Sequence, residues 1–115
     1  MNFGDLQREV QAWSSRNFPD AEPIHPLLGM QEELGEISHA YLKRIQGIRG
    51  TPEEHTAAIE DGVADLTVFI ADFCWRNGIS YQAVVGRTWA KVRERDWQSD
   101  PLNGWALAGE RGAAG

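Results

Sequence analysis

Hydrophobic side chains recur along the chain at the spacing of amphipathic helices, beginning near residue 6. Leu6, Val10 and Trp13 fall at positions i, i+4 and i+7, which places them on one face of a helix. Pro19 follows and begins a loop, because proline cannot continue a helix. The pattern therefore predicts a first helix over about residues 4–17.

A longer apolar stripe follows the loop and predicts a second helix over about residues 26–46. Pro26 suits a first helical turn, where its missing amide hydrogen costs nothing. Gly47 and Gly50 then end the helix and supply a turn. The stripe repeats at helical spacing through Leu27, Met30, Leu34, Ile37, Tyr41 and Ile45.

The third predicted helix has the most distinct start in the sequence. Thr51, Pro52 and Glu54 stand at the N-cap, N1 and N3 positions of a capping box, which satisfies backbone amides that otherwise lack partners. Gly78 is the predicted C-terminal stop. Between residues 59 and 75 the helix is apolar over most of its circumference, which is typical of a helix inside a bundle or at a subunit interface.

The fourth helix is predicted to begin after Ser80 and to run to about Trp97, with Val85, Trp89 and Val92 on one face. No alternating strand pattern competes with any of these helices. The expected fold class is therefore all-α, with the architecture of a four-helix bundle.

Length, composition and charge narrow the organisation and the partners. A chain of 115 residues fits one domain, and we expect residues 1–98 to form it and residues 99–115 to form a C-terminal tail packed by Leu102 and Trp105. The formal net charge of -6 argues against nucleic acid as a partner, since its backbone attracts basic surfaces. No apolar run is long enough to span a membrane. The single cysteine, Cys74, is predicted to be a buried thiol, which fits a cytoplasmic location.

Carboxylates on the predicted second helix lie beside its apolar stripe. Glu33 and Glu36 are three residues apart and share a face. Glu33 lies about 40° from Ile37 around the helix axis. These acids are therefore expected to border the core, although a pair of this kind on one helix is more often a solvated surface feature.

The predicted third helix carries a second row of acids in an otherwise apolar environment. Glu54, Asp61, Asp65 and Asp72 fall within about 40° of one another around its axis. Burying an unpaired carboxylate costs several kcal/mol, so a row facing the core requires cations. Oxygen ligands without His or Cys partners favour Mg²⁺, with Mn²⁺ as a substitute. The two rows on adjacent helices together predict a divalent metal site.

The predicted fourth helix offers positive charge to complement that site. Lys91 and Arg95 are four residues apart on one side of it, and cations there suit the oxygens of a polyphosphate. Their alternative role is an ordinary solvated flank. Asp96 is in line with the apolar face and is expected to point inward. His25 either caps the loop before Pro26 or contacts a base or ribose.

The acidic segments resemble the MazG-like, all-α nucleoside triphosphate pyrophosphohydrolase superfamily. That superfamily carries E-x-x-E on one helix and E-x-x-D on the next, and all four acids bind magnesium. Residues 28–37 are similar to its first motif, and residues 89–97 resemble its phosphate-binding last helix. The likeness covers about residues 4–97 and implies a MazG-type fold.

One position departs from the motif and shifts the implied ligand set. Glu33 and Glu36 match the first acid pair, and Asp65 matches the final Asp. The remaining Glu would fall at Gly62, which has no side chain to offer. Asp61 lies on the same helix face as Asp65 and is expected to replace the missing glutamate as a ligand. Asp72 and Glu32 are held as reserve candidates.

The resemblance implies a magnesium-dependent enzyme that converts a nucleoside or deoxynucleoside triphosphate to the monophosphate and pyrophosphate, as in nucleotide-pool house-cleaning. Glu33 or Glu36 would orient or deprotonate the attacking water. The substrate-binding residues would be Lys91, Arg95, Asp96 and His25. The family's bundles are dimers or dimers of dimers, and the apolar third helix also predicts a homo-oligomer.

Three other functions remain open from the sequence. A relative specialised for dUTP or phosphoribosyl-ATP would use the same acids with a different pocket. A non-enzymatic helical interaction module would bind no metal. A metal-storage bundle is the third, and the absence of ligating His and Cys side chains counts against it.

Overall fold

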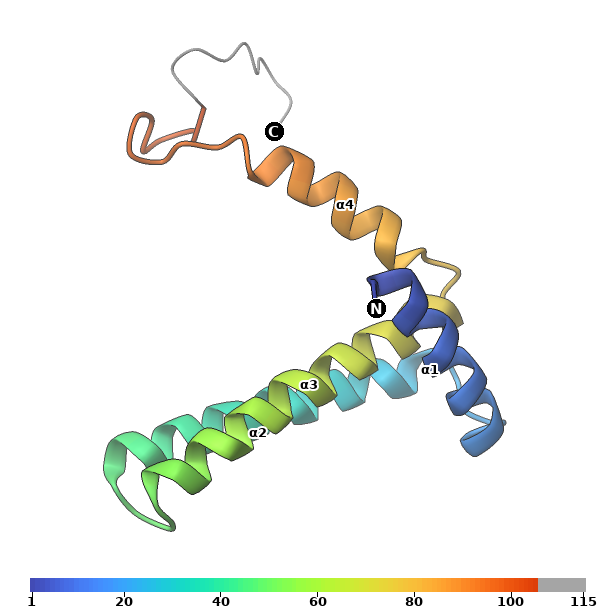
Figure 1. Cartoon of the computed structure of the whole chain (residues 1–115), viewed down its shortest axis with the longest axis horizontal. Helices are drawn as coiled ribbons and strands as arrows, with labels where there is room; N and C mark the ends of the chain where they lie inside the picture. The colour runs from blue at the N-terminus through green and yellow to red at the C-terminus, as the bar shows by residue number, and fades with distance from the viewer. Residues whose placement is uncertain (106–115) are drawn as a thin grey trace. The chain divides into compact units, whose positions relative to one another are not determined.

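The regular structure of the chain is helical, as the hydrophobic spacing predicts. The computed structural model describes residues 1–105, and no strand occurs among them. Residues 106–115 of the predicted tail lie outside the described residues. The helices, labelled in Figure 1, are α1 (Phe3–Asn17), α2 (Ile24–Gln46), α3 (Pro52–Arg76) and α4 (Tyr81–Val92).

Two of the helices begin with capping boxes. The Thr51 hydroxyl accepts from the Glu54 amide at 3.1 Å, and the Thr51 amide donates to the Glu54 carboxylate at 3.0 Å, which confirms the predicted start of α3. Asn2 and Asp5 make the same reciprocal pair at the start of α1. Side chains thus supply partners for amides that a helix N-terminus leaves unpaired.

α2 and α3 lie side by side and run in opposite directions (Figure 1). The Arg44 guanidinium donates to the Thr56 hydroxyl at 3.0 Å near the connecting turn. Further along, Ile37 packs directly on Gly62, where a Cβ atom would lie 2.5 Å from Ile37 Cγ1. Gly62 is buried, so the close approach of the two helices depends on the absence of a side chain at this position.

A buried arginine ties α1 and its following loop to the end of α3. The Arg76 side chain is 7% exposed and pairs with Asp72 at 3.0 Å. It also donates to the Ser14 hydroxyl at 2.7 Å and to the Ala21 carbonyl oxygen at 2.9 Å. Ser14 is itself fully buried. One side chain therefore fixes three segments around the end of α3.

The apolar core of this part of the molecule lies where α1 and α3 meet. Val10, Ala71 and Tyr81 are buried there together with Cys74. The predicted burial of the Cys74 thiol is confirmed, and that burial raises its pKa. No helix among the described residues has both the length and the apolar composition that a membrane span needs.

The chain divides into two compact units, residues 1–81 and residues 82–115. The predicted end of the fourth helix at about Trp97 is wrong, because α4 ends at Val92. Beyond it the chain turns back on itself. The Asp96 amide donates to the Gly104 carbonyl oxygen at 2.7 Å, and Arg95 forms an isolated antiparallel bridge with Trp105. These hydrogen bonds replace those of a continued helix.

Candidate functional site

The side chain of Glu33 is buried on α2 without a full set of partners. It is 9% exposed, and its Oε2 atom accepts no hydrogen bond from any described residue. Burial raises the pKa of this carboxyl group, and the nearby Glu36 and Asp65 carboxylates raise it further. A buried carboxylate oxygen without a donor is costly, so the position is chemically incomplete without a cation or a proton.

Two further glutamates of α2 lie close to Glu33. Glu32, Glu33 and Glu36 each offer a carboxylate oxygen, and these oxygens lie within 4.8 Å of one another. Glu32 and Glu36 are exposed. Oxygen donors of this kind suit Mg²⁺ or Mn²⁺, and the unpartnered oxygen of Glu33 is the observation that a bound cation would explain. The residues present therefore fit a divalent metal ion.

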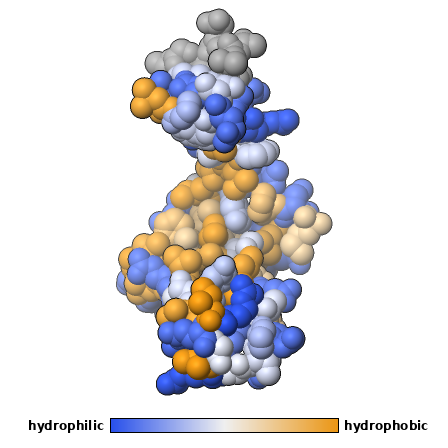
Figure 2. Space-filling view, turned by 90° about the vertical axis from the view of Figure 1, so that its left-hand side faces the viewer, coloured by the Kyte–Doolittle hydropathy of each residue, from blue (hydrophilic) through white to orange (hydrophobic). Residues whose placement is uncertain are grey.

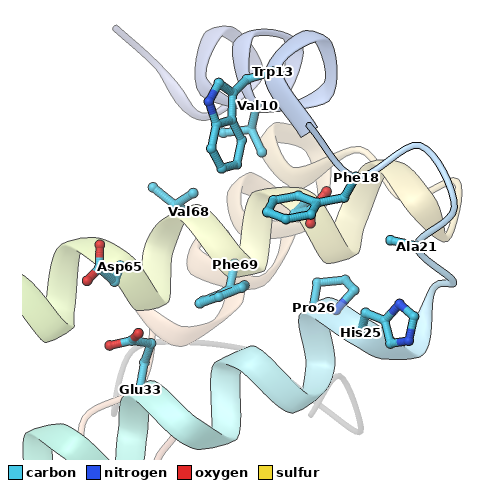
Figure 3. A pocket seen from close by; sticks show the side chains of 11 residues that line it. Val10, Trp13, Phe18, Ala21, His25, Pro26, Glu33, Asp65, Val68 and Phe69 are labelled. Atoms are coloured by element: carbon cyan, nitrogen blue, oxygen red, sulfur yellow. The ribbon is translucent and has the colours of Figure 1, made fainter. Parts of the chain in front are cut away.

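Asp65 extends the cluster from α2 to α3. The two acidic residues Glu33 and Asp65 come from facing helices, and Figure 3 shows both side chains at one end of a cavity. The antiparallel pairing of the helices produces this meeting, because Ile37 opposite Gly62 brings Glu33 opposite Asp65 one turn later. The sequence predicted both residues as ligands, and the structure brings them together.

The cavity has a volume of about 500 Å³ and apolar walls. It runs along α2 and α3 from the two acids past Phe69, and α1 covers it with Val10 and Trp13 (Figure 3). A size of this order suits a small organic ligand. The lining residues are Val10, Trp13, Phe18, Ala21, His25, Pro26, Glu33, Asp65, Val68, Phe69 and Asp72.

His25 takes the capping role that the sequence offered, and contact with a base or ribose remains a prediction. Its Nδ1 atom accepts from the Glu22 amide at 3.0 Å, which caps the turn before α2. In the neutral ring Nε2 then carries the hydrogen. The residue also lines the cavity (Figure 3), so a hydrogen-bond donor is available there.

Asp61 occupies a different position from the other predicted ligands. It is exposed on α3, one turn before Asp65. Among the described residues it belongs neither to the three-glutamate cluster nor to the cavity lining. At the neighbouring position, Gly62 faces Ile37, so a side chain there would meet α2. Asp61 as a replacement ligand remains a prediction.

The predicted phosphate-binding residues lie in the second unit. Lys91 is exposed in the last turn of α4. Arg95 lies beyond the helix, so the expected i, i+4 pair on one helix face does not form. The continuing helix on which the inward position expected for Asp96 depended does not form. The Asp96 carboxylate instead accepts from the Ser99 hydroxyl at 2.6 Å and the Ser99 amide at 3.1 Å, and these bonds lower its pKa.

Sequence reasoning missed the part of Arg76 in shaping the cavity. Its hydrogen bonds to Ser14 and Ala21 hold the loop that supplies Phe18 and Ala21 to the cavity wall. The available signal was the i, i+4 spacing of Asp72 and Arg76, which allows an ion pair but does not reveal the contacts of Arg76 with Ser14 and Ala21.

Taken together, the site pairs a carboxylate cluster with an adjoining apolar cavity. The carboxylates suit a divalent cation and through it an anionic group. The cavity, with Trp13, Phe18 and Phe69 in its walls, suits a flat organic ring. No protein-family model, no curated protein and no solved structure matches the chain.

Proposed function

We propose that this protein is a magnesium-dependent nucleoside triphosphate pyrophosphohydrolase of the MazG-like type. The observation that carries the proposal is the buried Glu33 carboxylate, with one unpartnered oxygen, at the end of an apolar cavity. An interaction module gains nothing from such a group. An enzyme that must hold a cation beside a ring-shaped substrate requires it.

Glu33, Glu36 and Asp65 are the residues proposed to hold the metal, with Asp61 and Glu32 as further candidates. Bound Mg²⁺ would neutralise charge on the phosphate oxygens and activate water for attack. Glu33 or Glu36 accepts the proton from the attacking water. The water oxygen bonds to the α-phosphorus, and the bond from that phosphorus to the bridging oxygen breaks. Pyrophosphate leaves, and the nucleoside monophosphate remains.

The cavity is the proposed place for the base. Phe69 and Trp13 offer ring faces in its walls, and flat rings stack favourably on aromatic side chains. Lys91 and Arg95 remain candidates for phosphate binding on the resemblance alone. We also propose that the active unit is a cytoplasmic homo-oligomer, a dimer or a tetramer.

A screen for pyrophosphate release tests the proposal. The common NTPs and dNTPs, with dUTP and phosphoribosyl-ATP included, are incubated with the protein with and without Mg²⁺. We expect magnesium-dependent release that falls by at least about 100-fold in Asp65→Asn, because this change removes one charge from the metal site without changing its size. Glu60→Gln is the matched control, since Glu60 is exposed on α3 and should retain full activity.

The outcomes separate the proposal from its rivals. Turnover of dUTP or phosphoribosyl-ATP alone would identify a specialised relative. Wild-type turnover in Asp65→Asn at saturating Mg²⁺ would remove this residue from the site. An absence of both turnover and metal binding would favour an interaction module.

A further inference from the structure

Two helical turns beyond Asp65, the cavity is lined by a carboxylate that the sequence held in reserve as a ligand and that lies outside the three-glutamate cluster. Asp72 lines the cavity with a side chain that is 13% exposed. Its Oδ1 atom accepts both from Trp75 Nε1 at 2.7 Å and from Arg76 Nε at 3.0 Å. Oδ2 accepts none of the hydrogen bonds found among the described residues, so it is the oxygen left for a ligand.

We infer that Asp72 selects substrates whose base carries an exocyclic amino group, an inference that rests on the proposed function. Cytosine, adenine and guanine carry such a group, whereas uracil and thymine do not. The amino group would donate to Asp72 Oδ2 while the phosphates lie at the opposite end, beside Glu33 and Asp65.

The spacing of polar groups along the cavity matches a nucleotide. Asp65 and Asp72 are seven residues apart on one face of α3, which corresponds to about 10.5 Å along the axis. Val68 and Phe69, which also line the cavity, lie between them along α3. A nucleotide has the same order of parts: an anionic group, a ring with apolar faces and a hydrogen-bonding edge.

The chemistry of the carboxylate determines which edge of a base it can bind. An ionised carboxylate offers acceptors only. Cytosine N4 and adenine N6 are donors, whereas the corresponding O4 of thymine is an acceptor, as it is in uracil. The N3 hydrogen of uracil and thymine lies between two carbonyl oxygens. A carboxylate that approaches this hydrogen is therefore repelled by both oxygens.

Arg76 fixes the position of this carboxylate. Its guanidinium pairs with Asp72 and also donates to Ser14 and Ala21, so the pair is held against α1 and the following loop. A carboxylate held in this way offers only acceptor oxygens to a ligand. The selection is therefore built into a rigid part of the cavity.

The first test varies the ligand and leaves the protein unchanged. Calorimetric titration at saturating Mg²⁺ compares dCMP, dUMP and the pyrimidin-2-one analogue of dCMP, which lacks only the amino group. We expect Kd to rise by at least about tenfold for both dUMP and the analogue. Equal Kd values for the three would overturn the inference.

The second test varies the protein. Asp72→Asn places an NH₂ donor beside the base and should abolish or reverse the preference for dCMP over dUMP, whereas Glu60→Gln should preserve it. Circular dichroism establishes that the variant is folded, because the change also removes the charged partner of Arg76. A folded Asp72→Asn protein with the full wild-type preference would overturn the inference.

Monophosphate binding does not require turnover, which separates this inference from the proposed function. A protein that prefers dCMP but releases no pyrophosphate from any triphosphate would support base selection by Asp72 and overturn the enzymatic proposal. A protein that hydrolyses all dNTPs with equal kcat/KM and binds the monophosphates equally would support the enzyme and overturn the selection.

Discussion

At the scale of single residues, the buried carboxylate of Glu33 opposes folding when no cation is present. Its pKa is raised by burial and then by Glu36 and Asp65, so it is higher in the folded than in the unfolded state. Ionisation of Glu33 therefore lowers the free energy of unfolding. This loss is complete at pH values above the pKa of the folded state and absent at pH values below the pKa of the unfolded state. A functional group that destabilises its own fold is typical of a binding site.

Glu33→Gln should therefore raise the melting temperature of the magnesium-free protein at pH 7 to 8, because it removes a buried charge. The gain should shrink as the pH falls through the folded pKa and vanish below the unfolded pKa. Added Mg²⁺ at about 100 times its Kd should stabilise the wild type by about 2.7 kcal/mol and the variant by much less. Thermal melts by circular dichroism measure both effects.

Glu60→Gln serves as the control for these melts, since an exposed acid of α3 should show neither effect. Equal stabilisation of Glu33→Gln and wild type by Mg²⁺ would show that Glu33 is not a ligand. If Glu33→Gln did not change the melting temperature in the absence of the metal, the burial of Glu33 would carry no cost.

The candidate site was predictable from the sequence where helical periodicity alone decides which residues share a face. Glu33 and Asp65 were found in this way, because each lies beside an apolar stripe. The ion pair between Asp72 and Arg76 uses i, i+4 spacing, but periodicity does not reveal the contacts of Arg76 with Ser14 and Ala21. Those depend on a loop whose path the sequence pattern leaves open.

At the scale of the helices, the close packing of α2 on α3 depends on Gly62. A Cβ atom at residue 62 would lie 2.5 Å from Ile37 Cγ1. Ile37 is β-branched and has little rotamer freedom in a helix. A glutamate at residue 62 would therefore require α2 and α3 to separate.

A double-mutant cycle on Gly62 and Ile37 measures this packing. Gly62→Ala alone adds about 1 kcal/mol of helix propensity but incurs about 1–3 kcal/mol of overpacking. In an Ile37→Ala background the overpacking disappears, so Gly62→Ala should stabilise the protein. Urea unfolding should therefore give a coupling energy of about 1–3 kcal/mol. Additive effects of the two changes would show that the helices do not meet there.

Helix ends were predictable only where their signals are local. Thr51 begins α3 as expected because a capping box involves residues three apart. The end of α4 was not predictable, because the pairing of Asp96 with Gly104 competes with the helix. Gly104 lies outside the apolar repeat of the fourth helix, so helical periodicity does not reveal this pairing.

At the scale of the whole molecule, many apolar side chains remain exposed. Figure 2 shows hydrophobic residues among hydrophilic ones on the face that it draws. On α3, Val63 is 54% exposed. The exposed apolar side chains of α2 are Ile24, Leu28, Leu34, Tyr41, Leu42 and Ile45. Exposure on this scale favours association with further copies of the chain.

Light scattering at micromolar concentration should therefore give a mass of at least twice the 12.9 kDa of one chain. Replacing Leu34 and Ile45 on α2 with Lys should reduce that mass, because charge is costly in an apolar interface. A fully active species near 12.9 kDa would show that the monomer is sufficient.

The position of bond cleavage tests the central claim most directly. The triphosphate that the protein turns over fastest is hydrolysed with Mg²⁺ in water enriched in oxygen-18, and the products are identified by phosphorus NMR and mass spectrometry. If the protein is a pyrophosphohydrolase in which water attacks the α-phosphorus, the label enters the nucleoside monophosphate, equal amounts of unlabelled pyrophosphate form, and Glu33→Gln abolishes both products. Formation of nucleoside diphosphate and orthophosphate, or label in the pyrophosphate, would contradict the account.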